Sequence, residues 1–290
     1  MRAGRFRTLV AAALALPLLL TACGGDDEAP TDVQSDASFA AGTTMAKLND
    51  AKSVKIGVKF DQPGLGYKKP GTDTPEGFDI EIAKIVAAKL GIEPGQVEWV
   101  ETVSKNREPF LQNGTVDMVV ASYSITDERR ETVGQAGPYY VTGQQLLVRK
   151  DDSSITGPDA LTGKKVCSVT GSTSIKTVQE KYGAAPVPFA TYTECVQQLL
   201  NNSVDAVTTD GSILLGYAAQ QPDKLKVVGE PFSEERYGIG FKKGDNAFCT
   251  FLNDTLNGAF GDGAWQKAYE DTLGKGGGET PAKPTLDPCS

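Results

Sequence analysis

The sequence contains no histidine among its 290 residues, and no two of its five cysteines lie at C-x-x-C spacing. Transition metals are bound chiefly by histidine and by closely spaced cysteine, so the sequence predicts no metal site, and we expect no cofactor. Histidine is also the commonest general acid or base, and its absence argues against an enzyme. The net charge of −8 argues against nucleic-acid binding, which needs clustered lysine and arginine.

No membrane span is expected near the N-terminus, where the apolar run at 9–20 is too short and is interrupted by Pro17. Three arginines precede this run, and Leu-Thr-Ala-Cys ends it at Cys23. This order of basic, apolar and small residues predicts a secretory signal peptide at 1–22. Its removal takes away three arginines and no acids, so the mature charge would be −11.

The four residues that end at Cys23 resemble the bacterial lipobox, in which cleavage precedes the cysteine and its thiol receives lipid. The resemblance implies a lipoprotein anchored through Cys23 at the extracellular face of the bacterial cell membrane. A plain signal peptide with an incidental cysteine is the alternative, and the polar run at 24–28 makes it the weaker one. Residues 23–51 are rich in small and polar residues, which predicts a flexible tether, and 274–290 predict a similarly loose tail.

Export also gives a role to the other four cysteines, because disulfides are the default state in an oxidising compartment. Three pairings of four cysteines are possible. The favoured one joins cysteines that lie in the same region of the chain, Cys167 with Cys195 and Cys249 with Cys289.

The body of the chain is predicted to alternate between strands and helices. In its first half we expect strands at 54–58, 97–100 and 116–120, and helices at 78–90 and 104–113. The segment Asn-Gly-Thr-Val-Asp from Asn113 is echoed by Asn-Asn-Ser-Val-Asp from Asn201, which indicates a second, similar unit. There we expect strands at 165–169 and 204–208, and helices ending at 182, 200 and 220. Such alternation predicts the α/β fold class with parallel sheets.

One stretch of the first unit has the features of a carboxylate site. An apolar strand leads into hydroxyl side chains at 122–124 and then into a helix start from Thr126 to Arg129. Free N–H groups at a helix N-terminus attract an anion, and an arginine fork pairs with both oxygens of a carboxylate. The alternative is that Thr126 only caps the helix and that Arg129 only pairs with Glu128 or Glu131. The segment alone leaves the two interpretations even.

Further polar positions are expected beside this segment. In open parallel sheets, ligands bind beyond the carboxyl ends of the strands. Residues 122–129, the turn 171–174 and Asp210 all follow predicted strand ends, so they form one candidate site. Two units that face each other would make this site a cleft.

These segments carry a resemblance to a known family. They are the helix start at 77–81, Asn-Gly-x-Val-Asp from Asn113, and the segments 125–129, 138–140, 171–174 and 204–210. On them, residues 53–273 resemble the family 3 extracellular solute-binding proteins of polar amino-acid ABC transporters, of the glutamate/aspartate-binding type.

The resemblance implies a type II periplasmic-binding-protein fold, in which two lobes, each a sheet flanked by helices, hold a ligand in the cleft between them. Lobe 1 would comprise 52–149 and 237–273, and lobe 2 would comprise 150–236. The family's function implies a monomer that captures an amino acid and delivers it to an ABC transporter permease without catalysis. A cyclohexadienyl-dehydratase-like enzyme on the same fold is the less favoured alternative, because it needs a positioned general acid or base.

The resemblance also assigns contacts with the α-carboxylate of the ligand. Arg129 matches the arginine that holds this group, helped by Ser124 and by the N–H groups around Ser172 and Thr173. A bidentate arginine–carboxylate pair is among the stronger polar contacts available.

Asp210 matches the acid that receives the α-ammonium, together with the Ser122 carbonyl. Charge considerations agree, because a buried amino acid needs one fixed charge of each sign. The alternative for Asp210 is an N-cap of the helix that follows, and both roles can hold together.

Lys59 and Arg107 fall where glutamate/aspartate-binding members place basic residues against the side-chain carboxylate. The alternative is that both only decorate the surface, as lone lysines and arginines commonly do. Tyr192 stands near the place of a histidine that some acidic amino-acid binders carry, and Val169 replaces the lysine of glutamine-specific members. The resemblance therefore implies L-glutamate as ligand, with aspartate second, and leaves glutamine or another polar amino acid as the alternative.

Overall fold

The computed structural model describes Met1, residues 33–276 and residues 280–289. All the described helices and strands belong to Thr31–Ser290, which forms one compact unit. The predicted signal peptide beyond Met1, the lipidation site Cys23 and the tether up to residue 32 lie outside the described residues. Within the described part, no helix is both long and apolar enough to cross a membrane.

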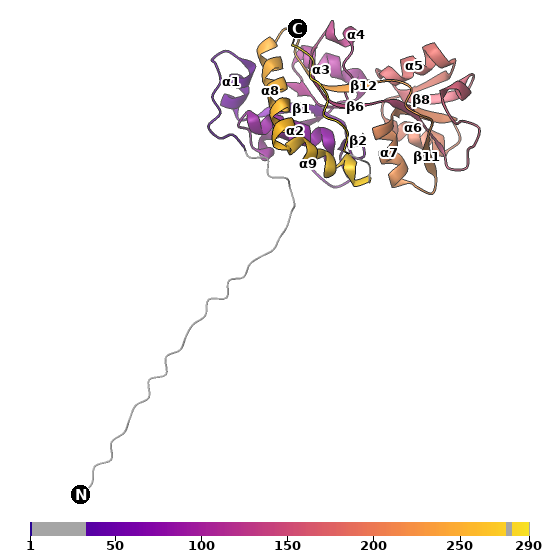
Figure 1. Cartoon of the computed structure of the whole chain (residues 1–290), viewed down its shortest axis with the longest axis horizontal. Coiled ribbons are helices and arrows are strands. Elements are labelled where there is room, and N and C mark those ends of the chain that lie inside the picture. Colours follow the sequence, from indigo (N-terminus) through magenta and orange to yellow (C-terminus); the bar gives the residue numbers. More distant parts are fainter. Residues whose placement is uncertain (2–32, 277–279, 290) are drawn as a thin grey trace. The chain divides into compact units, whose positions relative to one another are not determined.

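Two five-stranded sheets organise this compact unit (Figure 1). Their strand orders are β4-β1-β5-β12-β6 and β11-β7-β10-β8-β9. The first sheet contains β1 (Val54–Val58), β4 (Val97–Glu101), β5 (Met118–Val119), β6 (Gly134–Thr142) and β12 (Glu235–Phe241). The second contains β7 (Gln144–Arg149), β8 (Lys165–Val169), β9 (Ala185–Phe189), β10 (Ala206–Asp210) and β11 (Leu225–Val228). A small ribbon, β2 (Asp61–Gln62) and β3 (Gly66–Tyr67), follows β1.

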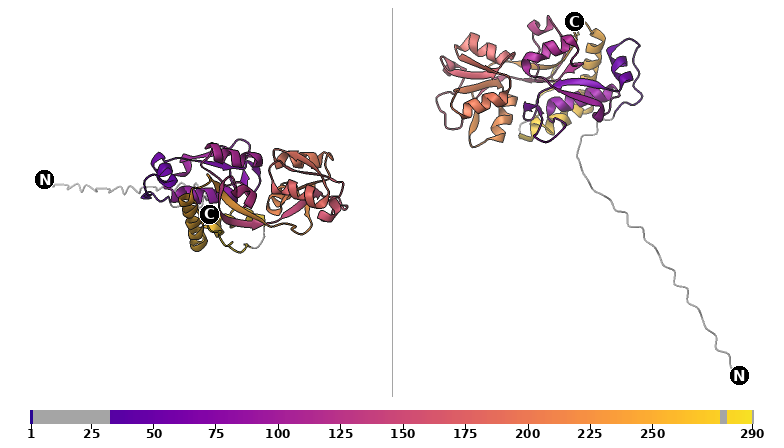
Figure 2. Two further views of the ribbon diagram at one scale, coloured as in Figure 1. Left: turned by 90° about the horizontal axis from the view of Figure 1, so that it is seen from above. Right: turned by 180° about the vertical axis from the view of Figure 1, so that it is seen from behind.

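Helices cover the sheets in two groups, which with their sheets we call lobe 1 and lobe 2 (Figure 1 and Figure 2). Lobe 1 has α1 (Thr44–Ala51), α2 (Phe78–Lys89), α3 (Arg107–Asn113), α4 (Asp127–Arg130), α8 (Asn246–Asp262) and α9 (Ala264–Glu270). Lobe 2 has α5 (Thr173–Tyr182), α6 (Tyr192–Leu200) and α7 (Gly211–Gln220). Short 3-10 helices are η1 (Pro94–Gln96), η2 (Ser104–Asn106), η3 (Pro158–Leu161) and η4 (Leu273–Gly276).

The predicted α/β class with two lobes is confirmed, but each sheet is mixed rather than parallel. β1 runs parallel to β4 and β5, whereas β12 runs antiparallel to β5 and β6. In the second sheet, β8 runs parallel to β9 and β10, whereas β7 runs antiparallel to β10 and β11. The chain leaves lobe 1 through β6 and β7 and returns through β11 and β12. A returning strand that pairs beside the outgoing one runs in the opposite direction, which makes these pairs antiparallel.

The chain crosses from lobe 1 to lobe 2 at Gly143 and returns between β11 and β12. Because β7 belongs to the second sheet, the predicted lobe boundary at residue 150 is wrong by one strand. On the return, Glu235 already pairs with Thr142 of β6, ahead of the predicted boundary at residue 237. A Cβ at Gly143 would lie 2.5 Å from the Ser233 carbonyl oxygen, so glycine lets the two crossing segments approach closely.

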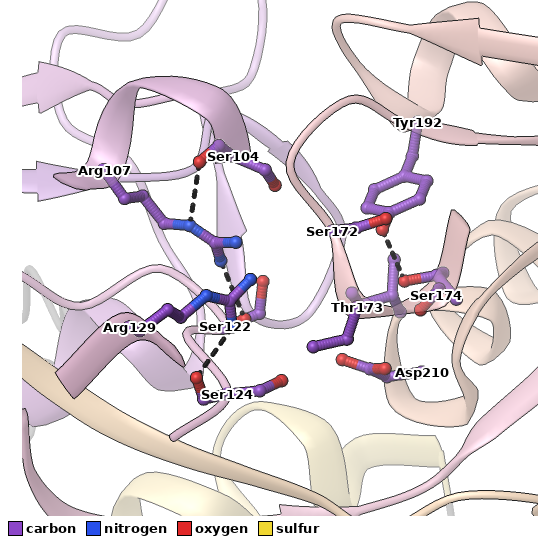
Figure 3. A pocket seen from close by; sticks show the side chains of 12 residues that line it. Ser104, Arg107, Ser122, Ser124, Arg129, Ser172, Thr173, Ser174, Tyr192 and Asp210 are labelled. Carbon is purple, nitrogen blue, oxygen red and sulfur yellow. Dashed lines mark hydrogen bonds between the residues drawn. The ribbon is translucent and has the colours of Figure 1, made fainter. Parts of the chain in front are cut away.

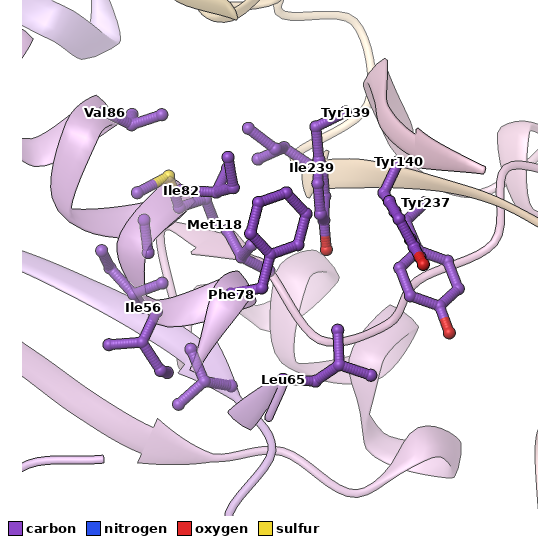
Figure 4. Packing of buried hydrophobic residues seen from close by; sticks show 14 of the residues in the cluster. Ile56, Leu65, Phe78, Ile82, Val86, Met118, Tyr139, Tyr140, Tyr237 and Ile239 are labelled. Carbon is purple, nitrogen blue, oxygen red and sulfur yellow. The ribbon is translucent and has the colours of Figure 1, made fainter. Parts of the chain in front are cut away.

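An aromatic cluster around Phe78 holds lobe 1 together (Figure 4). The buried Phe78 ring packs at centroid distances of 5.6–6.0 Å against Tyr139, Tyr140, Trp265 and Tyr269. Trp265 Nε1 donates to the Tyr139 carbonyl oxygen at 2.7 Å, which ties α9 to β6. The cluster therefore joins the start of α2, the outgoing strand and the C-terminal helices in one core.

The core extends to the loop that follows β5. Asp79, next to Phe78 on α2, is fully buried and accepts hydrogen bonds from the Tyr139 hydroxyl and from the Ser122 N–H, both at 2.7 Å. Ser122 has a positive φ of 43°, an unusual backbone conformation for a residue with a side chain. Asp79 thus fixes the conformation of a loop that carries predicted ligand residues.

The predicted tether is folded at its C-terminal end. Met45 and Leu48 of α1 are buried in the core, and the Thr44 hydroxyl donates to Asp245 at the start of α8. The prediction of a tether up to residue 51 is therefore wrong for this helix. Two apolar residues in an eight-residue helix are too few to show a helical period in the sequence.

The predicted loose tail is also attached to lobe 1. Cys289 is bonded to Cys249 of α8, and Asp287 forms ion pairs with lobe 1. The second bridge joins Cys167 and Cys195 in lobe 2, so both favoured disulfides are confirmed. The loose-tail prediction is wrong for residues 280–289, because their contacts are with residues distant in the sequence.

Candidate ligand-binding site

A pocket lies between the two lobes and is lined by both (Figure 3). As the lobes stand, the free space between its walls is only about that of a single water molecule, so the pocket is nearly filled by its own side chains. Eight of the nine predicted ligand residues line it: Arg107, Ser122, Ser124, Arg129, Ser172, Thr173, Tyr192 and Asp210. Ser104, Ser174, Thr209 and Ile213 complete the lining and were not predicted.

Arg129 lies on α4, whose start is capped as predicted. The Thr126 hydroxyl accepts a hydrogen bond from the Arg129 N–H at 3.2 Å. The Arg129 side chain is buried and points into the pocket, with its Nε 3.2 Å from a carboxylate oxygen of Glu108 on α3. Within residues 33–276 its ion pair is with Glu108, so the alternative of a surface pair with Glu128 or Glu131 is wrong.

Arg107 begins α3 and is only 2% exposed, so it is not a surface residue. Its Nε donates to the Ser104 carbonyl oxygen at 3.2 Å, and its Nη1 donates to those of Ala121 and Ser122 at 3.1 Å each. Burial and, next, the neighbouring Arg129 lower its pKa to about 10. Because Arg107 occupies one lone pair of the Ser122 carbonyl, that oxygen keeps one for another donor.

The two arginines act together. Nη2 of Arg107 and Nη2 of Arg129 donate to the Gly171 carbonyl oxygen of lobe 2, at 3.3 and 3.0 Å. Both guanidinium groups lie over the buried Tyr123 ring, at 4.4 and 4.9 Å from its centroid. The negative face of an aromatic ring stabilises a cation, so Tyr123 offsets part of the repulsion between the two like charges.

Lys59, at the end of β1, is the predicted residue that does not line the pocket. It is 3% exposed, and its Nζ donates to the Ser104 hydroxyl oxygen at 2.8 Å. Burial and, next, the charge of Arg107 lower its pKa to about 7. The surface alternative is wrong for Lys59 too, but the structure places it behind Ser104 rather than in the pocket wall.

Asp210 ends β10 on the opposite side of the pocket (Figure 3). It is 4% exposed, and its Oδ2 accepts a hydrogen bond from the Tyr237 hydroxyl at 2.5 Å. Its Oδ1 has no hydrogen-bond partner among the described residues. Burial and, next, the charge of Glu235 raise its pKa to about 7. Asp210 stands at the N-cap position of α7, as the alternative had it, but its side chain makes no capping bond there.

Some of the groups on α5 and α6 that were predicted to contact the ligand already have hydrogen-bond partners in the protein. Ser172 caps α5, since its hydroxyl oxygen accepts from the Ile175 N–H at 3.2 Å. The Ser172 N–H, predicted for the ligand, donates to the Val169 carbonyl oxygen at 3.2 Å. The Tyr192 hydroxyl accepts from the Thr209 hydroxyl at 2.7 Å and lines the pocket.

Glu235, the first residue of β12, is a buried acid that the sequence reasoning missed. Its Oε2 accepts from the Ser124 hydroxyl at 2.5 Å and from the Thr173 hydroxyl at 3.0 Å, one from each lobe. Ser124, predicted to help hold a ligand carboxylate, therefore turns its hydroxyl to Glu235, and so does Thr173, whose N–H was the predicted group. A glutamate at the start of a strand whose next residues are largely apolar is the signal that could have identified it.

Contacts outside the pocket also join the lobes. Asp61 Oδ2 accepts from the Tyr192 N–H at the start of α6 at 2.7 Å, and the Asp61 carbonyl accepts from the Tyr217 hydroxyl of α7. On α5, Lys176 pairs with Glu128 of α4 at 2.9 Å. The structure therefore shows the lobes closed on the pocket.

Gly216 of α7 allows this closure, because a Cβ there would lie 2.3 Å from the Pro63 carbonyl oxygen of lobe 1. Gly216→Val should weaken ligand binding by about 5- to 150-fold, since overpacking the contact costs about 1–3 kcal/mol in the closed state alone. Calorimetric titration measures the loss. Gly258→Val on α8, where a Cβ would meet no atom within 4 Å, is the control, and equal affinities of the two variants would contradict the role of Gly216.

A two-lobed fold with a buried arginine and a buried aspartate on opposite walls of one small pocket is the architecture of a binding protein that closes on a small ligand. The profile of the bacterial extracellular solute-binding proteins, family 3, matches residues 54–275. The chain belongs to this family.

Two relatives and one solved structure illustrate the similarity. The chain is 38% identical to the glutamate-binding protein GluB of Corynebacterium efficiens, over 93% of this chain and 91% of that one. It is 36% identical to the ABC transporter glutamine-binding protein GlnH of Bacillus subtilis, over 87% and 91%. The ancestral amino acid-binding protein AncCDT-1, a precursor of cyclohexadienyl dehydratase, has a TM-score of 0.73 at 29% identity, with 80% of this chain and all of that one covered.

Proposed function

We propose that the protein captures L-glutamate, with aspartate as a second ligand, for an ABC importer, and that it performs no chemistry. The opposition of Arg129 and Asp210 across one buried pocket carries this conclusion, because Asp210 Oδ1 lacks a partner among the described residues. A free amino acid has one anion and one cation, and each would find a fixed countercharge there. The glutamate- and glutamine-binding relatives support this ligand class.

Selection of glutamate would depend on Arg107. Its guanidinium group lies on the same side of the pocket as that of Arg129 (Figure 3), and Lys59 adds a third cation behind Ser104. A carboxylate gains more from such donors than a neutral amide does, since charge-assisted hydrogen bonds are the stronger ones. Glutamine is the alternative ligand, because Arg107 can also donate to an amide oxygen.

The ligand would hold the closed state together. Arg129 belongs to lobe 1 and Asp210 to lobe 2, so one ligand meets both charges only when the lobes are in contact. The importer's permease would then recognise the closed form. The family is extracellular, and we infer for this chain a monomer that is lipid-anchored through Cys23 to the bacterial cell membrane.

Calorimetric titration of the mature chain (23–290, with Cys23→Ser), stripped of bound amino acid by unfolding and refolding, tests the function. Glutamate should bind tightest among Glu, Asp, Gln and Asn. Tighter binding of glutamine would favour the alternative, and binding of none would contradict the proposal. The pKa of Asp210, about 7, would also suit a general acid in catalysis. As a control, the protein is incubated with a prephenate-like acid, and formation of product would indicate an enzyme.

Lys59→Met should weaken glutamate binding more than glutamine binding, because the lysine charge favours only a charged ligand side chain. We expect the dissociation constant for glutamate to rise about tenfold, since the lysine charge acts through Ser104 rather than by direct contact with the ligand. Titration of both ligands measures the difference, with the exposed Lys55→Met as control. Equal losses for the two ligands would contradict the role in selection.

The same variant should change the pH dependence of stability. The pKa of Lys59 is lowered from 10.5 to about 7 in the folded protein. Between these values the unfolded state binds more protons, so this lysine makes stability rise with pH. Lys59→Met should remove that rise and stabilise the ligand-free protein below pH 7, as thermal unfolding at pH 6 and pH 9 would show.

A further inference from the structure

The C-terminal strap, residues 280–289, contacts two arginines of lobe 1 near its end. The Asp287 carboxylate pairs with Nη2 of Arg130 at 2.7 Å and with Nη2 of Arg236. Burial opposes ionisation of Asp287, but the hydrogen bonds from the two arginines outweigh it and lower its pKa. One carboxylate therefore bridges α4 to the start of β12, two segments that are far apart in the sequence.

Each arginine directly follows a residue of the ligand site. Arg130 follows Arg129 on α4, and Arg236 follows Glu235, which holds the hydroxyl of Ser124. The helix α4 has four residues, too few to be stable without tertiary contacts. Without Asp287 two cations would face each other at the back of the site, so both segments would move apart.

The strap is itself fixed to α8 beside Asp287. Cys289 is bonded to Cys249, and Asn253 Nδ2 donates to the Asp287 carbonyl oxygen at 2.8 Å. The Asp287 N–H donates to the Gly137 carbonyl oxygen at 2.6 Å, which adds a contact with β6. The carboxylate thus has a defined position relative to the lobe 1 core.

We propose that Asp287 is a positioning residue for ligand binding. Held by the Cys249–Cys289 bridge, its carboxylate keeps Arg130 and Arg236 together, and through them it sets the position of Arg129 and of the Ser124–Glu235 hydrogen bond. This role rests on the proposed capture of an amino acid. It acts on the α-carboxylate end of the site and not on side-chain selection.

Asp287→Asn in the mature chain should weaken binding of glutamate and of glutamine by the same factor, about 5- to 30-fold. Asp287→Glu should recover most of the loss, because it restores the charge. Cys249→Ser with Cys289→Ser should cause a similar loss, and adding Asp287→Asn to it should change little. Glu98→Gln, at an exposed ion pair of lobe 1, is the matched control and should have no effect.

A double-mutant cycle of Asp287→Asn and Arg129→Lys distinguishes positioning of Arg129 from a general loss of stability. If Asp287 acts through Arg129, Asp287→Asn should cost much less in the Arg129→Lys background than in the wild type, at temperatures well below unfolding. Additive losses, a loss confined to glutamate, or unchanged affinity of Asp287→Asn would overturn the inference while leaving the proposed function intact. Failure of the wild type to bind any of the twenty amino acids would instead refute the proposed function and this inference with it.

Discussion

Arg129→Ala should weaken glutamate binding by about three orders of magnitude, because removing one partner of a buried ion pair costs about 3–5 kcal/mol. The ligand carboxylate would stay buried without its countercharge, and the bond to the Gly171 carbonyl of lobe 2 would also be lost. Glutamine should lose as much, since it has the same α-carboxylate. Calorimetry on the stripped mature chain measures both losses.

Two further variants show whether the loss comes from the guanidinium group of Arg129 itself. Arg129→Lys keeps the charge but not the planar fork, so we expect an intermediate affinity. Lys55→Ala removes a cation from an exposed pair with Glu98 and should leave affinity unchanged. Glu108 would lose its partner in Arg129→Ala, but its side chain is 23% exposed and can be hydrated. A dissociation constant for Arg129→Ala within a few-fold of the wild type would rule out this residue as the carboxylate anchor.

Secondary structure was predictable where one apolar pattern extends over a whole element. The strands β1 and β8 have the predicted ends, and α2 differs from its prediction by one residue. The strand predicted at 116–120 is reduced to Met118–Val119, because strand length is set by pairing with β1 and β12. An apolar pattern indicates a buried extended segment but does not identify its neighbours.

The lobe boundary depends on such distant pairing. Residues 134–149 form two strands that are separated only by Gly143, and the first belongs to one sheet and the second to the other. Nothing local distinguishes this glycine from one in a turn. The fold of the strap was unpredictable for the same reason, since Asp287 meets Arg130 across 157 positions.

The site was predictable in its residues and not in its hydrogen bonds. Strand ends and the family resemblance brought eight predicted residues to one pocket. The ion pair of Arg129 with Glu108 and the bond of Ser124 to Glu235 come from elements whose contact the sequence does not specify. These two predicted ligand residues therefore have protein partners when the lobes are closed.

Asp210→Asn should have opposite effects on stability and on binding. The pKa of Asp210 is raised from 3.8 to about 7, so between these values the folded protein binds more protons than the unfolded chain. This group therefore makes stability fall as pH rises through that window. Asparagine cannot ionise, so the ligand-free variant should be more stable than the wild type at pH 8, by thermal unfolding.

Binding should change the other way, because the ligand ammonium needs the ionised carboxylate. We expect Asp210→Asn to lose about 3–5 kcal/mol of affinity at pH 8, or roughly two to four orders of magnitude. Wild-type affinity should rise as pH increases through about 7, whereas the variant should lack this rise. The exposed Asp223→Asn in lobe 2 is the control for both measurements. A gain in stability together with a loss of binding is what a carboxylate waiting for the ligand's cation predicts. A variant that is less stable and still binds normally would instead show that the unpartnered Oδ1 of Asp210 serves the fold and not the ligand.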